Sequence, residues 1–263
     1  MYPFEYLRPT SLADALKVGA EGGYLAGGMT LLPSLKLRLA NPSRLVDLSA
    51  VPDLSGIKVE KDRVTVGAMT RHADVAHSPD VRRVVPALAE LAEGIGDRMV
   101  RNRGTLGGSI ANNDPSADYP GALLALGATV VTDRREIPAD KFFTGMFSTA
   151  LAPGELVTKV IFPVARRAAY MKFPSPASRY AMVGVFVAET SAGVRVAVTG
   201  AASCAYRLPT FEAALARSFA AASLAGLTVS SDGLNQDLHG SPEYRASLVP
   251  VMARRAVAAA VAR

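Results

Sequence analysis

The chain has 263 residues, 49% of them hydrophobic, and a formal net charge of +6. This composition excludes a disordered chain, and no apolar run reaches the roughly 20 residues that a helix needs to span a bilayer. One cysteine, Cys204, excludes a disulfide framework and an iron–sulfur cluster held by this chain alone, and three histidines with unsuitable spacing predict no metal site.

The first fifty residues alternate between helical and extended patterns. They predict a helix over 12–18, a strand over 24–26, a helix over 31–39 and a strand over 44–48. Ser11 can cap the first helix, because Asp14 follows at the third helical position. The glycine-rich segment 26–30 (Ala-Gly-Gly-Met-Thr) lies between a strand and a helix, so this unit is read as strand, glycine loop, helix, strand.

From Ile57 the hydrophobic period changes to two, which predicts an antiparallel hairpin over 57–66 with its turn at Lys61-Asp62. A helix is predicted over 81–93. Beyond the second glycine segment, the pattern predicts a helix over 122–126 that ends at Gly127, and strands over 129–132 and 155–162. The mixture of hairpins and helices indicates an α+β fold.

The second glycine segment, 105–109 (Thr-Leu-Gly-Gly-Ser), precedes a polar run that includes Asn112, Asn113, Asp114 and Asp118. Glycine lets backbone approach a ligand, because no Cβ stands in the way. Both segments can thus offer amides to one diphosphate, and the alternative for the first is a tight strand-to-helix turn. The carboxylates suit ribose hydroxyls or a flavin edge, or else cap the helix before Tyr119.

The last third predicts a hairpin over 182–190 and 194–201, a helix over 210–222 and a terminal helix from Ser241, with Pro242 at its first position. Pro250 is expected to kink this helix. Glycine loops are absent from this part of the sequence, so a boundary near residue 170 is expected, followed by a small α+β domain.

The common nucleotide and hydrolase motifs are missing. Residues 94–99 (Gly-Ile-Gly-Asp-Arg-Met) lack the third glycine of the dinucleotide fingerprint and follow a helix. Neither a P-loop G-K-[ST] nor a nucleophile elbow G-x-S-x-G occurs. The glycine segments therefore need another explanation.

Three segments of the sequence explain the glycine segments: AGGMTLLPSLKLRL (26–39), RNRGTLGGSIANNDPSADYPGALLALGA (101–128) and YMKFPSPASRYAMVGVFVA (170–188). They resemble the FAD-binding medium subunit of the molybdenum hydroxylases, the family of carbon monoxide dehydrogenase and xanthine dehydrogenase. The resemblance extends over nearly the whole chain. It implies an α+β fold with a two-subdomain FAD-binding domain of the PCMH/vanillyl-alcohol-oxidase type at 1–170 (subdomains 1–54 and 55–170), and a C-terminal domain at 171–263.

The resemblance also implies a set of cofactor-binding residues. The two glycine segments would hold the FAD diphosphate, Asp118 would be the acidic flavin contact, Lys172 a basic group near the ring and Tyr180 the aromatic residue beside it. The residues assigned to FAD in this way are Ala26, Gly27, Gly28, Met29, Thr30, Leu31, Thr105, Gly107, Gly108, Ser109, Asn112, Asp118, Val157, Lys172 and Tyr180. The residues of the chain themselves offer no catalytic nucleophile pair and no set of metal ligands, so no catalytic residue and no metal ligand are predicted.

The implied function is electron transfer within a cytoplasmic heterotrimer. A partner with molybdopterin would oxidise the substrate, a small subunit with two [2Fe-2S] clusters would pass electrons to FAD, and a quinone, NAD or another external acceptor would receive them. The alternatives are a flavin-free scaffold subunit and a free-standing flavoenzyme, for which His72, Asp97 and Tyr180 are candidate acid–base groups. Scattered arginines without a nucleic-acid motif predict no nucleic-acid partner, although Arg101 and Arg103 flank the second glycine segment.

Overall fold

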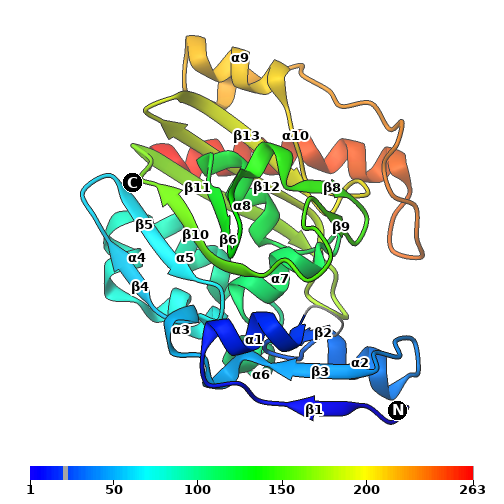
Figure 1. Cartoon of the computed structure of the whole chain (residues 1–263). Coiled ribbons are helices and arrows are strands. Elements are labelled where there is room, and N and C mark those ends of the chain that lie inside the picture. Colours follow the sequence, from blue (N-terminus) through cyan, green and yellow to red (C-terminus); the bar gives the residue numbers. More distant parts are fainter. Residues whose placement is uncertain (20–22, 263) are drawn as a thin grey trace.

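The computed structural model describes residues 1–19 and 23–262. The N-terminal unit is a three-stranded parallel sheet in the order β1-β3-β2, with β1 at Glu5–Leu7, β2 at Gly23–Leu25 and β3 at Arg44–Asp47. Helices α1 (Leu12–Gly19) and α2 (Leu31–Lys36) connect the strands, and the unit forms the bottom layer in Figure 1. The predicted cap is confirmed, because Ser11 Oγ accepts from the Asp14 amide at 3.1 Å.

Helix α2 is shorter than the prediction of 31–39. Arg38 adopts a left-handed conformation with φ of +60°, and the Leu39 amide donates to the Ser34 carbonyl while the Arg38 amide donates to Leu35. This is a Schellman ending, which satisfies the last carbonyls of the helix. It was missed because the left-handed position is occupied by arginine rather than glycine, and the apolar Leu37 and Leu39 extend the helical pattern while remaining exposed.

The central unit is a five-stranded antiparallel sheet in the order β4-β5-β10-β6-β7. Its strands are β4 (Ile57–Val59), β5 (Arg63–Gly67), β10 (Val157–Pro163), β6 (Thr129–Thr132) and β7 (Glu136–Pro138). The hairpin over 57–66 and the strands over 129–132 and 155–162 are confirmed. A small hairpin, β8 (Phe143–Gly145) with β9 (Ser148–Thr149), lies beside this sheet.

The predicted helix over 81–93 is wrong as a single helix. It consists of α4 (Pro79–Val84) and α5 (Pro86–Glu93), and Val85 between them has φ of −137° and ψ of 66°. Proline disfavours helical geometry in the preceding residue and suits the first position of a new helix. Together with α3 (His72–His77), these helices share with the central sheet the largest apolar core among the described residues.

Three helices follow: α6 (Arg98–Arg103), α7 (Leu106–Asn112) and α8 (Tyr119–Leu126), which ends at left-handed Gly127 as predicted. The second glycine segment is therefore not a loop. Gly107 and Gly108 lie in the first turn of α7, which Thr105 caps. Single 3-10 turns occur at Leu48–Ala50, Pro52–Leu54, Ala139–Lys141 and Ala221–Leu224.

The C-terminal sheet is antiparallel in the order β11-β12-β13-β14, with bounds Arg167–Pro174, Ala181–Thr190, Gly193–Thr199 and Tyr206–Arg207. The predicted hairpin is thus confirmed. Both faces are covered: Val183, Val185 and Val187 of β12 join one core with α9 and α10, whereas Phe186 and Ala188 join the core of the central unit. Helices α5 and α8 pack on this second face.

Of the two remaining helices, α9 is shorter than predicted and α10 begins where it was predicted to begin. Helix α9 (Pro209–Arg217) ends before 222, because Ser218 is extended and brings Phe219 onto the core, where the Arg167 guanidinium lies over its ring. Helix α10 (Pro242–Val261) is capped by Ser241 and continues across Pro250 without a break. The domain boundary at residue 170 stays a prediction; β11 runs across that position.

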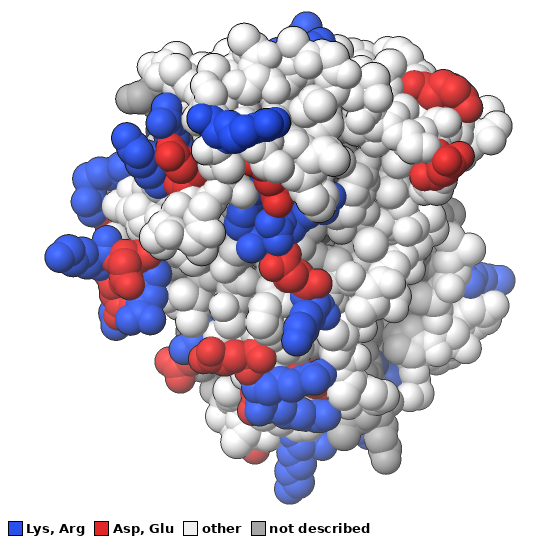
Figure 2. All heavy atoms as spheres, turned by 90° about the horizontal axis from the view of Figure 1, so that it is seen from above, with Lys and Arg blue, Asp and Glu red and all other residues white. Residues whose placement is uncertain are grey.

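The charged surface is mixed. Figure 2 shows acidic and basic side chains interleaved on the face seen from above. The arginine pairs at 82–83, 134–135 and 166–167 all meet carboxylates, namely Glu93, Asp80, Asp133, Glu155 and Glu189. Within the described part of the chain, no helix is long and apolar enough to cross a membrane.

Candidate functional site

One cavity of about 540 Å³ lies where the N-terminal unit meets α7 and the start of α8. Every residue that the resemblance assigns to FAD lines it, except Lys172: these are Ala26, Gly27, Gly28, Met29, Thr30, Leu31, Thr105, Gly107, Gly108, Ser109, Asn112, Asp118, Val157 and Tyr180. The volume lies within the range of about 300–1,000 Å³ that small-molecule sites occupy. The structure therefore brings residues from distant parts of the sequence around one space.

The first glycine segment is in close contact with the backbone that immediately precedes the second. A Cβ on Gly27 would overlap the Arg103 carbonyl oxygen and stand 2.8 Å from Gly104 Cα. A Cβ on Gly108 would lie 3.5 Å from Ala26 Cβ. The segments are thus neighbours in one wall of the cavity, and the absence of side chains at Gly27 is what allows this contact.

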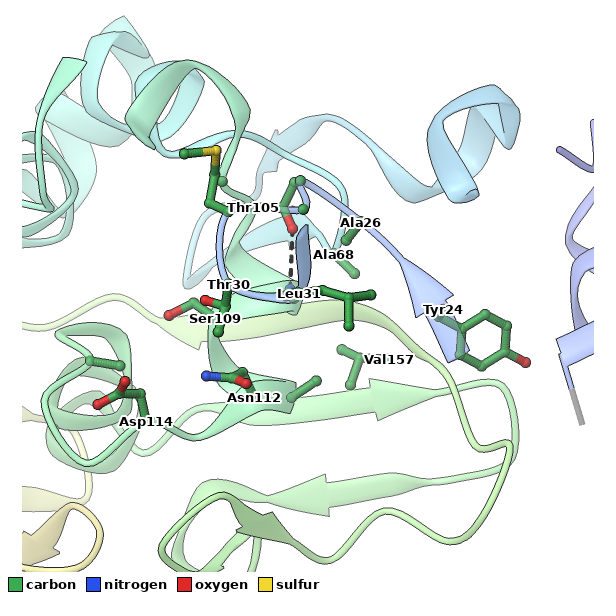
Figure 3. A pocket seen from close by; sticks show the side chains of 18 of the residues that line it. Tyr24, Ala26, Thr30, Leu31, Ala68, Thr105, Ser109, Asn112, Asp114 and Val157 are labelled. Carbon is green, nitrogen blue, oxygen red and sulfur yellow. Dashed lines mark hydrogen bonds between the residues drawn. The ribbon is translucent and has the colours of Figure 1, made fainter. Parts of the chain in front are cut away.

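The hydroxyl groups of this wall differ in their availability. Thr105 Oγ1 accepts from the Gly108 amide at 3.1 Å and is committed to capping α7 (Figure 3). Thr30 and Ser109 also line the cavity, and their hydroxyls make no hydrogen bond with any described residue. In this wall, the hydroxyls of Thr30 and Ser109 are thus free for a ligand.

Gly107 serves the packing of α7. Its amide donates to the Ala68 carbonyl at 2.8 Å, and a Cβ would approach Ala68 Cβ to 2.5 Å. This contact seats the first turn of α7 against the end of β5. Gly107 therefore packs α7 against Ala68, whereas Gly108 faces the first glycine segment.

Asp118 lies at the N-terminus of α8 but does not cap it. Its buried carboxylate accepts from the Tyr170 hydroxyl at 2.5 Å and lies 3.0 Å from Lys172 Nζ. Burial raises the pKa of the Asp118 carboxyl, and the charge of Lys172 and the Tyr170 hydrogen bond offset part of this effect. The capping alternative is wrong for Asp118.

Lys172 stands behind Asp118 rather than in the cavity wall. Its ammonium group also donates to the Gly94 carbonyl at 2.7 Å. Lys172 therefore places a positive charge near the cavity, with Asp118 between the two. A direct contact between Lys172 and the cofactor stays a prediction.

Two ionisable groups in the wall were not predicted as ligands. His72 is buried, its Nδ1 has no hydrogen-bond partner among the described residues, and burial, with Arg101, lowers its pKa to about 4. Glu155 accepts from Arg135 and from the Ala152 amide, and the Arg135 hydrogen bond is the main reason that its pKa falls to about 2. Neither belongs to a glycine segment, so the motif search had no signal for them.

Several polar residues singled out in the sequence lie elsewhere or have structural roles. Asp97 Oδ1 caps α6 through the Val100 amide, and Arg101 bonds the Ile95 carbonyl. Asn113 is fully buried and left-handed, and its Nδ2 donates to the carbonyls of Gly145 and Ser148. Burial raises the pKa of the Cys204 thiol. No cluster of His, Cys, Asp or Glu among residues 1–19 and 23–262 could hold a metal ion.

Comparison with known proteins decides the family. Residues 2–165 match the family described as FAD binding domain in molybdopterin dehydrogenase. The chain is 35% identical to the carbon monoxide dehydrogenase medium chain of Hydrogenophaga pseudoflava, over 99% of this chain and 98% of that one. The chain belongs to this family. It is also 37% identical to the nicotine 6-hydroxylase medium subunit of Paenarthrobacter nicotinovorans, over 98% and 97% of the two chains.

The fold of the medium subunits agrees along the whole length. A chain of carbon monoxide dehydrogenase from Oligotropha carboxidovorans superposes with a TM-score of 0.91 at 32% identity, over 100% of both chains. A chain of quinoline 2-oxidoreductase from Pseudomonas putida 86 gives 0.89 at 30% identity, over 99% and 98%. The protein is an FAD-binding medium subunit and thus a component of an oxidoreductase.

The cavity fits FAD as the cofactor of a medium subunit. Residues 26–30 and the first turn of α7 form one wall of the cavity, where the close backbone contact at Gly27 leaves no room for a Cβ. The free hydroxyls of Thr30 and Ser109 lie in the same wall. Apolar side chains such as Leu31 and Val157 cover another part of the wall, which suits an extended ring system (Figure 3). A wall with both polar and apolar parts suits a cofactor that has both phosphates and rings.

Proposed function

We propose that this chain carries electrons inside a molybdenum hydroxylase complex. The observation that supports the proposal most directly is that nearly all residues assigned to FAD from the sequence meet around one cavity. FAD supplies the redox chemistry, since it can accept electrons singly and release them to acceptors of several kinds. The protein supplies position and electrostatic environment.

Each wall of the cavity has a proposed task. The backbone of 26–30 and of Gly107-Gly108 holds the diphosphate, with Thr30 and Ser109 donating hydroxyl bonds. Asp118, backed by Lys172, meets the flavin end of the cofactor, and Tyr180 lies beside the rings at a position where the cavity meets solvent. In this arrangement the ring system stays within reach of other proteins, because Tyr180 is exposed.

The partners follow from the family role. A small subunit with [2Fe-2S] clusters would deliver electrons to this chain, and a large molybdopterin subunit would oxidise the substrate. The external acceptor is a quinone, NAD or another carrier, and the proposed location is the cytoplasm. The proposed domains are 1–170 for FAD and 171–263 for the C-terminal part.

The alternatives are a flavin-free scaffold of the same complex and a free-standing flavoenzyme. For the second, an acid–base group is needed beside the rings. Asp97 is engaged as a helix cap, and His72 is buried with its pKa lowered to about 4, which makes it a poor proton donor near neutral pH. These observations favour an electron carrier over a chain that transforms its own substrate.

The visible absorption spectrum tests the proposal, on the chain alone and on the complex purified with the proteins of neighbouring genes. We expect an oxidised-flavin band that Gly108→Asp abolishes and that Gly145→Asp, at a position with space for a side chain, leaves intact. A colourless wild-type complex would establish the scaffold instead. Flavin that substrate reduces in the isolated chain would establish a free-standing enzyme.

A further inference from the structure

Behind the cavity, a tyrosine that belongs to no glycine segment is bound to the acidic group of the wall. Tyr170 on β11 donates its hydroxyl to Asp118 Oδ1 at 2.5 Å, while Lys172, two residues later on the same strand, lies 3.0 Å from the same oxygen. Residues two apart on a strand share one face, so β11 presents both donors to Asp118. The carboxylate is thereby held from the side opposite the cavity.

Space for the Tyr170 ring depends on the neighbouring strand. A Cβ on Gly184 would overlap the Tyr170 hydroxyl. Gly184 pairs with Lys172 across β11 and β12, and the Tyr170 ring stacks on Phe186 at 6.1 Å between ring centroids. Gly184 therefore leaves space for the Tyr170 hydroxyl, and Phe186 packs against the Tyr170 ring. Together they fix the direction of the hydroxyl.

The hydrogen bond also determines how the carboxylate is used. Asp118 lines the cavity, whereas neither Tyr170 nor Lys172 does. A carboxylate has about four acceptor positions, and the two donors from β11 occupy part of them. Lys172 also donates to Oδ2 at 3.2 Å, so the acceptor positions that β11 leaves unoccupied are the ones available to a ligand in the cavity.

We propose that Tyr170 is a positioning residue that, in the space left by Gly184, holds the Asp118 carboxylate in the orientation in which it meets the flavin end of FAD. This inference rests on the proposed role of Asp118 in binding FAD. It assigns a task to the pair Tyr170 and Gly184, which do not touch the cofactor themselves. Loss of the Tyr170 hydroxyl frees the carboxylate to turn and leaves Lys172 as its remaining strong partner.

A double-mutant cycle tests the proposal. FAD dissociation constants are measured by fluorescence titration of the reconstituted full-length chain, or of the assembled complex, for wild type, Tyr170→Phe, Asp118→Ala and the double variant. We expect Tyr170→Phe to weaken FAD binding about tenfold, as for a lost hydrogen bond to a charged group. In the Asp118→Ala background the same change should have less than about a twofold effect, because the group that it positions is gone.

Matched controls separate positioning from stability. Tyr206→Phe removes a buried hydroxyl from β14 of the same sheet that has no partner among the described residues, and it should leave FAD binding unchanged. Gly184→Ala should reproduce the Tyr170→Phe effect by displacing the ring, and thermal unfolding shows which variants are folded. The flavin midpoint potential is a further readout, which Tyr170→Phe should shift and Tyr206→Phe should not.

The outcomes are distinct. Equal weakening by Tyr170→Phe in both backgrounds, or no weakening in wild type, overturns the positioning role while leaving FAD binding intact. A wild-type complex without FAD overturns the proposed function and, with it, this inference.

Discussion

Gly27 and Arg103 are in backbone contact: a Cβ on Gly27 would overlap the Arg103 carbonyl oxygen. The contact joins the N-terminal unit to the end of α6, two residues before the cap of α7. Because both partners are backbone, neither can yield by rotating a side chain. The wall formed by the two glycine segments therefore depends on this one missing side chain.

Gly27→Ala should separate the segments and abolish or strongly weaken FAD binding, with a loss of stability of about 1–3 kcal/mol from overpacking. Flavin content and urea unfolding measure the two effects. Gly23→Ala is the matched control in the same unit, since its Cβ would find its nearest neighbours at 3.8 Å. Normal flavin content in Gly27→Ala would show that the contact is not needed for the site.

We expect Asn113 to stabilise the fold. Asn113→Ala removes two hydrogen bonds to the β8–β9 turn and places alanine at φ of 45°, so we expect a loss of about 2–4 kcal/mol in the free energy of unfolding. Asn113→Gly loses the same bonds without the backbone strain and should recover about 1 kcal/mol. Equal stability of the two variants would contradict the contribution assigned to the left-handed conformation.

His72 should make the protein sensitive to mild acid. Its pKa is about 4 in the folded protein and 6.5 as an ordinary histidine, so the unfolded chain takes up the proton first. Stability is therefore complete above pH 6.5 and is lost as the pH falls toward 4, by about 3 kcal/mol at most. His72→Gln should flatten this part of the urea-unfolding profile, whereas His77→Gln, on the exposed side of the same helix, should not.

Glu155 should act at lower pH. Its pKa of about 2 lies below the ordinary 4.5, so its contribution is complete above pH 4.5 and is lost as the pH falls toward 2. Glu155→Gln should cost about 2 kcal/mol near neutral pH, because Arg135 loses a charged acceptor. The difference from wild type should shrink in unfolding experiments at pH 3; a constant difference would exclude the ion pair as its origin.

Local patterns predicted much of the fold. The Ser11 cap, the hairpin from Ile57 and the helix end at Gly127 each depend on residues close in sequence, and all are confirmed. The end of α2 was missed because arginine occupies a position that usually requires glycine. The division between α4 and α5 was also missed, although Pro86 carries a local signal for it.

The site was predicted where glycine and polar residues cluster along the chain. The resemblance supplied Asp118 and Lys172, but nothing in their sequence neighbourhoods indicates that these two meet, because their contact forms only when β11 meets the start of α8. Glu155 was missed as a wall residue for a similar reason. Its position depends on tertiary packing, and it forms no motif with its sequence neighbours.

The C-terminal sheet supports the cofactor site rigidly from behind Asp118. Strand β12 contributes side chains to two cores at once, so tilting the sheet away from α5 and α8 would uncover apolar surface. Tyr170 and Lys172 stand on the neighbouring strand of that sheet. In the proposed role of electron carrier, the charges and dipoles around FAD would then keep their places when the charge of the cofactor changes, and the site would not have to reorganise at each transfer.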